Sequence, residues 1–167
     1  MRRKLLLATN NQAKVGEYRS LLQNLPYELV TLAEQGITTI ASEEGDSLEE
    51  NARLKATHGV SKSQLVTLAD DSGLEVDALH GKPGIHSARF AGKNATDADR
   101  VTKLLAMMSS IPWDRRTAHF KCVIAIATPE GKLRLCQGKC RGIIAFEAKG
   151  KNGFGYDPIF YLPELAK

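Results

Sequence analysis

The chain has 167 residues, of which 43% are hydrophobic and 25% are charged, and its formal net charge is +4. These values are ordinary for one globular domain that buries a sizeable core, and they exclude a disordered or collagen-like chain. The charge is mild and no dense run of lysine and arginine accompanies it, so it fits an anionic small molecule at least as well as nucleic acid.

Hydropathy and cysteine usage predict a cytoplasmic protein without a membrane partner. No apolar run is long enough to span a bilayer, and the run Leu5–Ala8 is too short for a signal peptide. The odd number of cysteines favours a reducing compartment. Cys136, Cys140 and His119 lack the paired spacing of a zinc site, so we expect cysteines in strands to be small buried hydrophobes.

The first part of the chain predicts a strand, a polar loop and a helix. We expect the strand at Lys4–Ala8, the loop at Thr9–Lys14, and Asn10 or Asn11 as the helix N-cap. Backbone N–H groups at such a helix start can hold an anion, and Lys14 adds a positive charge one turn in. A lysine that is merely solvated on the helix surface is the alternative, since the glycines of a Walker A loop are missing.

A second helix is predicted after a capping box made by Ser47 and Glu50. Asn51 and Lys55 lie four residues apart and therefore share one face of this helix. Lys55 could reach a phosphate, or it could pair with Glu49 or with solvent.

The next segment joins a buried strand, Leu65–Ala69, to two adjacent carboxylates, Asp70 and Asp71. We expect the strand to end there, in a turn over Asp70–Gly73. Carboxylates at the end of a buried strand are costly unless a cation meets them, and Mg²⁺ prefers such hard oxygen ligands. A plain turn with solvated carboxylates is the alternative.

The remaining segments predict further strands and one more helix, with no repeats, linkers or low-complexity stretches. The helix is expected at Asp97–Ser110, with Thr96 as its cap. Strands are expected at Glu28–Leu32, Leu74–Leu79, Thr117–Thr128, Lys132–Gly138, Arg141–Phe146 and Ile159–Leu162.

A glycine-rich segment with two aromatic residues lies between the last two strands. Its glycines let the backbone approach a ligand closely. Phe154 and Tyr156 could stack on a nucleobase, and Asp157 could accept a hydrogen bond from a base or a ribose. The alternative is a turn whose aromatic side chains cap the core.

Five segments, taken in order, resemble the inosine triphosphate pyrophosphatase family, whose members hydrolyse non-canonical purine nucleoside triphosphates. They span almost the whole chain, and five ordered motifs are far more specific than any one of them. The segments are Leu7–Asn11 with Lys14, Glu50–Ala56, Ala69–Leu74, Pro83–Gly92 and Gly153–Phe160.

The resemblance implies an α/β fold: an elongated mixed central sheet with flanking helices, and two lobes around a nucleotide cleft. It implies one domain over residues 1–167, and a homodimer. The activity that it implies is the Mg²⁺-dependent hydrolysis of ITP, dITP or XTP to the monophosphate and pyrophosphate, which cleanses the nucleotide pool. The family continues past the position of Lys167 into a helix with a Ser-His-Arg motif, so this domain is expected to lack that helix.

By position, the resemblance also implies roles for individual residues. The implied catalytic residues are Asp71, Lys14 and Lys55. The implied ligands of Mg²⁺ are Glu43 and Asp71. Two points stay open: Glu44 could replace Glu43 as the metal ligand, and Asp70 and Asp71 could divide their roles either way. The implied substrate contacts are the triphosphate loop Thr9, Asn10, Asn11, Gln12, Ala13 and Lys14, together with Ser72 and the base-side residues Phe154, Gly155, Tyr156 and Asp157.

The expected mechanism follows from charge. Water attacks the α-phosphorus and pyrophosphate leaves, while Mg²⁺, Lys14 and Lys55 stabilise the developing negative charge. Asp71 or a neighbouring carboxylate orients or deprotonates the water. If Lys14 serves the phosphates from a helix surface, its replacement by alanine should leave the melting temperature almost unchanged.

Three rival functions remain open on the sequence alone. One is a related pyrophosphatase that acts on modified pyrimidine or canonical nucleotides. Another is a protein that binds nucleotides without catalysis. The last is a nucleic-acid-binding module, suggested by a pI near 9.0 but lacking a basic aromatic surface motif.

Overall fold

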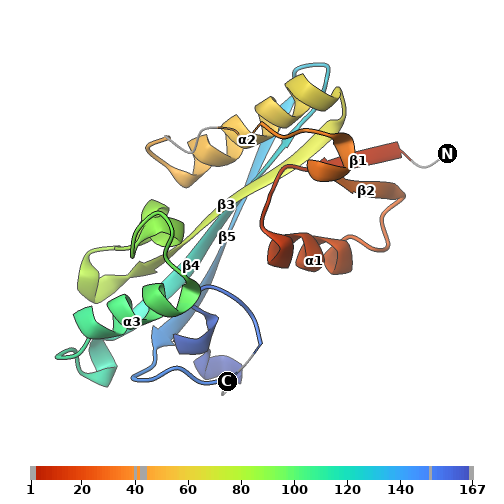
Figure 1. Ribbon diagram of the computed structural model, residues 1–167. Helices are drawn as coiled ribbons and strands as arrows, with labels where there is room; N and C mark the ends of the chain where they lie inside the picture. Colours follow the sequence, from red (N-terminus) through yellow and green to blue (C-terminus); the bar gives the residue numbers. More distant parts are fainter. Residues whose placement is uncertain (1–2, 40, 42–44, 151, 166–167) are drawn as a thin grey trace. The chain divides into compact units, whose positions relative to one another are not determined.

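A computed structural model describes residues 3–39, 41, 45–150 and 152–165. Its strands form one six-stranded mixed sheet in the order β2-β1-β3-β4-β5-β6, and helices flank it (Figure 1). The chain therefore has the mixed α/β fold that the sequence predicted. The strands are β1 (Arg3–Leu7), β2 (Tyr27–Thr31), β3 (Val66–Val76), β4 (Thr117–Ala127), β5 (Leu133–Ile144) and β6 (Phe160–Tyr161), and the α-helices are α1 (Gln12–Leu21), α2 (Leu48–Ser63) and α3 (Asp97–Met107).

The chain divides into two compact units, and each unit is assembled from two separate segments. Unit 1 comprises Met1–Asp71 and Cys122–Gln137, and unit 2 comprises Ser72–Lys121 and Gly138–Lys167. The long strands β3, β4 and β5 each contribute residues to both units. The elongated shape, the nucleotide cleft and the single domain over 1–167 stay predictions.

In unit 1, β1 lies between two parallel neighbours, β2 and β3. The register pairs Leu7 at the end of β1 with Leu68 of β3, and the Ala8 amide donates to the Leu68 carbonyl at 2.8 Å. Because β1 ends there while β3 continues, the loop after β1 lies beside the next residues of β3. Two of the segments that the sequence singled out, the loop after β1 and Ala69–Asp71, therefore lie side by side in unit 1.

Unit 2 has its own apolar core, formed by α3, the second half of β3 and the end of β5 (Leu74, Val76, Val101, Leu104, Met108, Ile144 and Ile159 among others). Arg116 is fully buried beside it, and this was not foreseen from the sequence. Its guanidinium donates to four backbone carbonyls, on Met108, Ile111, Ile144 and Ala145, at 2.6–3.1 Å. Burial lowers the pKa of this guanidinium from its ordinary value.

Two sequence expectations about strands are wrong. Asp70–Gly73 are not a turn, because β3 runs unbroken through them, beyond the last β3 residue that pairs with β1. Gly73 is required there for a close approach: a Cβ at this position would lie 2.3 Å from the Gly84 carbonyl oxygen. Similarly, the two strands expected at 132–138 and 141–146 are one strand, β5.

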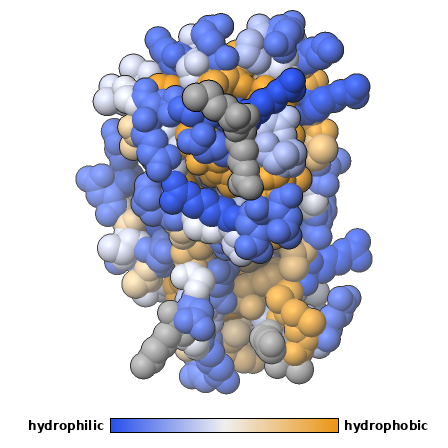
Figure 2. Space-filling model, turned by 90° about the vertical axis from the view of Figure 1, so that its right-hand side faces the viewer, coloured by the Kyte–Doolittle hydropathy of each residue, from blue (hydrophilic) through white to orange (hydrophobic). Residues whose placement is uncertain are grey.

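The surface bears on two further expectations. Within the described residues, no helix is both long and apolar enough to cross a membrane. Cys136 and Cys140 are exposed rather than buried, because β5 is solvent-accessible over most of its length. On the face shown in Figure 2, hydrophilic side chains predominate and hydrophobic ones are exposed in smaller areas between them.

Candidate active site

Two lysine–aspartate pairs lie in unit 1, where β3 continues beyond the end of β1. The Lys14 Nζ is 2.5 Å from the Asp70 Oδ2, and the Lys55 Nζ is 2.8 Å from the Asp71 Oδ1. All four side chains are largely buried, Asp70 most of all at 3% exposure. A buried carboxylate is costly unless it is paired, so each lysine is the counter-ion that keeps its aspartate in the sheet.

The two pairs face opposite sides of β3. Successive residues of a strand point to opposite faces, so Asp70 meets Lys14 on α1 while Asp71 meets Lys55 on α2. Figure 1 shows α1 and α2 on opposite sides of β3. The two neighbouring carboxylates therefore do not converge on one cation, as a turn would have allowed.

Asp71 has a second partner, Asn51, which lies on α2 one turn before Lys55. The Asn51 Nδ2 donates to the Asp71 Oδ2 at 3.0 Å, and its Oδ1 accepts the Gly45 amide at 2.9 Å. A Cβ at position 45 would lie only 2.7 Å from that Oδ1, so the contact requires glycine. The sequence placed Asn51 on the Lys55 face of the helix but gave it no role.

The loop after β1 has the cap that the sequence offered as one of two choices. Asn11 is the N-cap of α1, and its Oδ1 accepts the amides of Ala13 at 2.9 Å and Lys14 at 3.2 Å. The Asn11 amide in turn donates to the Thr9 hydroxyl oxygen at 3.2 Å. Two helix-start amides are thus already bonded to Asn11, and triphosphate binding by residues 9–14 stays a prediction. Lys14 is not the solvated lysine of the alternative reading.

Of the predicted metal ligands, Asp71 lies in the part of the chain that the structure describes. Glu43 and Glu44 lie outside the described residues, so neither predicted ligand is placed. Among the residues that are described, no three histidine, cysteine, aspartate or glutamate side chains cluster around a common point. Asp71 supplies a hard carboxylate oxygen of the type that Mg²⁺ takes alongside water and phosphate oxygens. The donor chemistry at Asp71 fits this ion.

The glycine-rich segment in unit 2 is held at two points. The Gly155 amide donates to the Asp97 Oδ2 at 2.7 Å, and the Tyr156 hydroxyl donates to the Ser87 carbonyl at 2.9 Å. Tyr156 is buried in the core of this unit, and burial raises its pKa to about 12. The Tyr156 ring therefore caps the core, which was the alternative interpretation of this segment.

The other predicted base-side and substrate residues are less enclosed. Phe154 and Gly155 are half-buried, Asp157 is exposed, and the Asp157 carboxylate accepts the Phe154 amide at 3.0 Å. Ser72 is half-buried on β3. Contact of these residues with a substrate stays a prediction.

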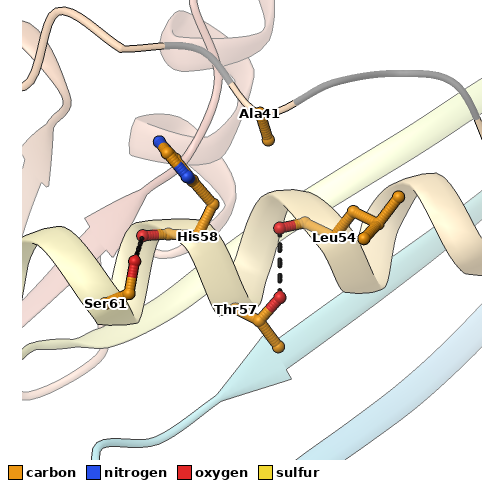
Figure 3. Close-up of a pocket in the computed structure, with 5 residues that line it drawn as sticks. All are labelled: Ala41, Leu54, Thr57, His58 and Ser61. Carbon is orange, nitrogen blue, oxygen red and sulfur yellow. Dashed lines mark hydrogen bonds between the residues drawn. The ribbon is translucent and has the colours of Figure 1, made fainter.

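A separate pocket of about 380 Å³ lies along α2 and the segment at Ala41 (Figure 3). Leu54, Thr57, His58 and Ser61 complete its lining. The Thr57 and Ser61 hydroxyls point back to carbonyls of their own helix, at 2.7–3.1 Å. The described residues of the lining include no lysine or carboxylate, which are the groups that phosphate or metal binding needs.

Comparison with known proteins shows similarity over nearly the whole chain. A model of the Ham1 family matches residues 5–167. The dITP/XTP pyrophosphatase of Desulforamulus reducens is 48% identical over 161 residues, which cover 96% of this chain and 80% of that protein. The enzyme of the same name from Photobacterium profundum is 47% identical over 163 residues, covering 96% and 82%.

Solved structures give the same result. The HAM1 protein from Coxiella burnetii superposes with a TM-score of 0.88 at 41% identity, covering 99% of this chain and 84% of the other. The nucleoside-triphosphatase / dITP/XTP pyrophosphatase from Mycobacterium abscessus gives a TM-score of 0.78 at 43% identity, covering 96% and 84%.

Proposed function

The chain belongs to the Ham1 family, and on that basis we propose that it is a dITP/XTP pyrophosphatase. It hydrolyses dITP and XTP, and by extension ITP, to the nucleoside monophosphate and pyrophosphate. The observation that carries this proposal is the 48% identity to an enzyme of that name over 96% of the chain. The family is the one that the five sequence motifs predicted. We further propose that the protein acts in the cytoplasm and as a homodimer.

In the proposed reaction, water attacks the α-phosphorus, the bond to the bridging oxygen breaks, and pyrophosphate leaves with that oxygen. Lys14 and Lys55 supply positive charge to the phosphates as negative charge moves onto the leaving group. Both lysines are now bonded to aspartates, so the triphosphate has to share them or take them over. A bound Mg²⁺ would add Lewis-acid stabilisation of the phosphate oxygens.

We assign different roles to the two aspartates because they face opposite sides of β3. Asp71 orients or deprotonates the water, and together with Glu43 or Glu44 it would hold Mg²⁺. Asp70 serves instead as the counter-ion of Lys14. For the base, we propose that Phe154 provides the stacking surface and that Tyr156, buried in the core of unit 2, anchors the segment.

The test is to incubate the protein with Mg²⁺ and each nucleoside triphosphate in turn, and to measure pyrophosphate and phosphate separately. We expect pyrophosphate with the monophosphate from dITP, XTP and ITP, and little turnover of ATP or GTP. Release of phosphate with the diphosphate would contradict the proposal. Preference for a modified pyrimidine or a canonical nucleotide would support the related pyrophosphatase instead. Tight triphosphate binding with no release of either product would support a nucleotide-binding protein.

A further inference from the structure

The two carboxylate oxygens of Asp71 have partners of different kinds. Oδ2 accepts a neutral amide N–H from Asn51 at 3.0 Å, and Oδ1 accepts the ammonium of Lys55 at 2.8 Å. A carboxylate that is held on both oxygens has a fixed orientation. The question is which of the two partners is able to leave.

Asn51 is fixed in its place. Only 1% of its surface is exposed, and both ends of its amide are in use, one toward Gly45 and the other toward Asp71. Turning the amide over would place its oxygen against the Asp71 carboxylate and its NH₂ against the Gly45 N–H. Its departure would leave buried polar groups without partners, which is costly. We therefore expect the hydrogen bond from Asn51 to Asp71 to persist when another cation binds to Asp71.

Lys55 also has more than one partner, but it is less enclosed than Asn51. Its ammonium ends a flexible four-carbon stem, and its side chain is 14% exposed, so the head group can move. It also contacts the Asp70 carbonyl oxygen at 3.3 Å, which is a longer and weaker contact. A second cation that approaches Oδ1 competes directly with this ammonium, because like charges at such distances repel.

From these contacts we propose that Asn51 is a positioning residue that fixes Oδ2 of Asp71, so that Oδ1 exchanges Lys55 for a divalent metal ion. The released lysine is then available to the phosphates. This inference rests on the proposed function, because it takes Asp71 as the metal-binding carboxylate. It predicts that removing Asn51 weakens metal binding and that removing the Lys55 ammonium strengthens it.

The test measures the binding of Mn²⁺ alone, without nucleotide, by the electron paramagnetic resonance signal of the free ion. Asn51→Ala and Asn51→Ser should bind Mn²⁺ about tenfold or more weakly than the wild type, as found when the outer partner of a metal ligand is removed. Lys55→Met should bind Mn²⁺ more tightly than the wild type, because the competing cation is gone. Two Asn51 variants are tested in case one of them fails to fold, and a melting curve is recorded for each.

Leu48→Ala is the matched control, because Leu48 is a buried residue of the same helix whose apolar side chain cannot donate a hydrogen bond to either carboxylate. It should lower the melting temperature and leave the Mn²⁺ affinity unchanged. Equal Mn²⁺ affinities for the Asn51 variants and this control would overturn the inference. So would a Lys55→Met protein that binds Mn²⁺ no more tightly than the wild type, or a wild type that binds none.

Failure of this inference is distinguishable from failure of the proposed function. The metal measurements contain no nucleotide, whereas the proposed function is tested by the products formed from dITP. If the wild type releases pyrophosphate but the predicted order of Mn²⁺ affinities is absent, only the roles proposed here for Asn51 and Lys55 are contradicted. If it releases phosphate instead, the pyrophosphatase proposal falls, whatever the metal affinities are.

Discussion

Lys14→Ala should destabilise the protein, although an ordinary lysine on a helix surface would not. The structure places the Lys14 ammonium 2.5 Å from Asp70, a carboxylate whose side chain is only 3% exposed. Removing the lysine leaves that carboxylate buried without its counter-ion. From the sequence alone, Lys14→Ala was expected to leave the melting temperature almost unchanged, and the buried pair with Asp70 reverses that expectation.

The size of the effect follows from the burial of the pair. Removing one partner of a buried ion pair typically costs 3–5 kcal/mol, so we expect a loss of about 3 kcal/mol in the free energy of unfolding. For a chain of this length, each kcal/mol lowers the melting temperature by roughly 2–4 °C, which gives a fall of about 6–12 °C. Replacing Asp70 by asparagine in the same protein removes the unpaired charge and should restore part of the loss.

The assay is thermal unfolding of the apo protein, followed by circular dichroism, with Arg19→Ala as the matched control. Arg19 also lies on α1 and pairs with Glu34 at 2.9 Å, but both of those side chains are about half exposed. Both changes introduce alanine into the same helix, so helix propensity largely cancels, and an exposed pair contributes little. Equal melting temperatures for Lys14→Ala and Arg19→Ala would refute the argument from burial.

Three further predictions concern single side chains. Asp71→Asn keeps the shape of the side chain and should lower kcat for dITP by roughly two orders of magnitude. Because it leaves the largely buried Lys55 ammonium without this counter-ion, it should also lower the melting temperature of a protein that still folds; unaltered turnover would remove Asp71 from the mechanism. Arg116→Met removes the guanidinium donor from four carbonyls, two of them in buried and two in partly buried contacts, and should cost about 3 kcal/mol in urea unfolding, whereas a loss within error would show that water replaces the guanidinium. Burial raises the pKa of Tyr156 from 10.0 to about 12, so between these values the phenol stays neutral in the folded state and ionises in the unfolded state. The stability that Tyr156 contributes is therefore fully present below pH 10 and is lost as the pH rises through about 12. Unfolding measured across this range should show a smaller loss for Tyr156→Phe than for the wild type; Tyr18, whose pKa burial also raises, contributes in the same sense to both proteins.

Local features of the fold were predictable because they depend on residues that are close in sequence. Thr96 caps α3 with the reciprocal bonds to Asp99 that a capping box requires, and Ser47 caps α2. The polar loop after β1 and the cap at Asn11 follow from the same kind of pattern. Lys14 and Lys55 lie on the two helices that the sequence predicted for them, and their roles in the reaction stay predictions.

What the sequence could not show depends on pairing between distant segments. The Asp-Asp-Ser-Gly stretch has the composition of a turn, but it continues β3 beyond the end of β1, and the extended strand sends Asp70 and Asp71 to opposite faces. The partner of Asp70 is 56 residues away in the chain, at Lys14. Asn51 has no motif that announces its contact with Asp71, because its role exists only once α2 lies against β3.

The segmented make-up of unit 1 has a consequence for how the chain folds during synthesis. Polypeptides emerge from the ribosome N-terminus first, and their domains generally fold as units. Residues 1–71 can form β1, β2 and the start of β3 early, but the part of β4 that completes this unit begins only at Cys122. Until then β3 has an open edge, the kind of surface that pairs with other chains. The nascent protein therefore has to remain soluble with an incomplete sheet while the intervening fifty residues are made.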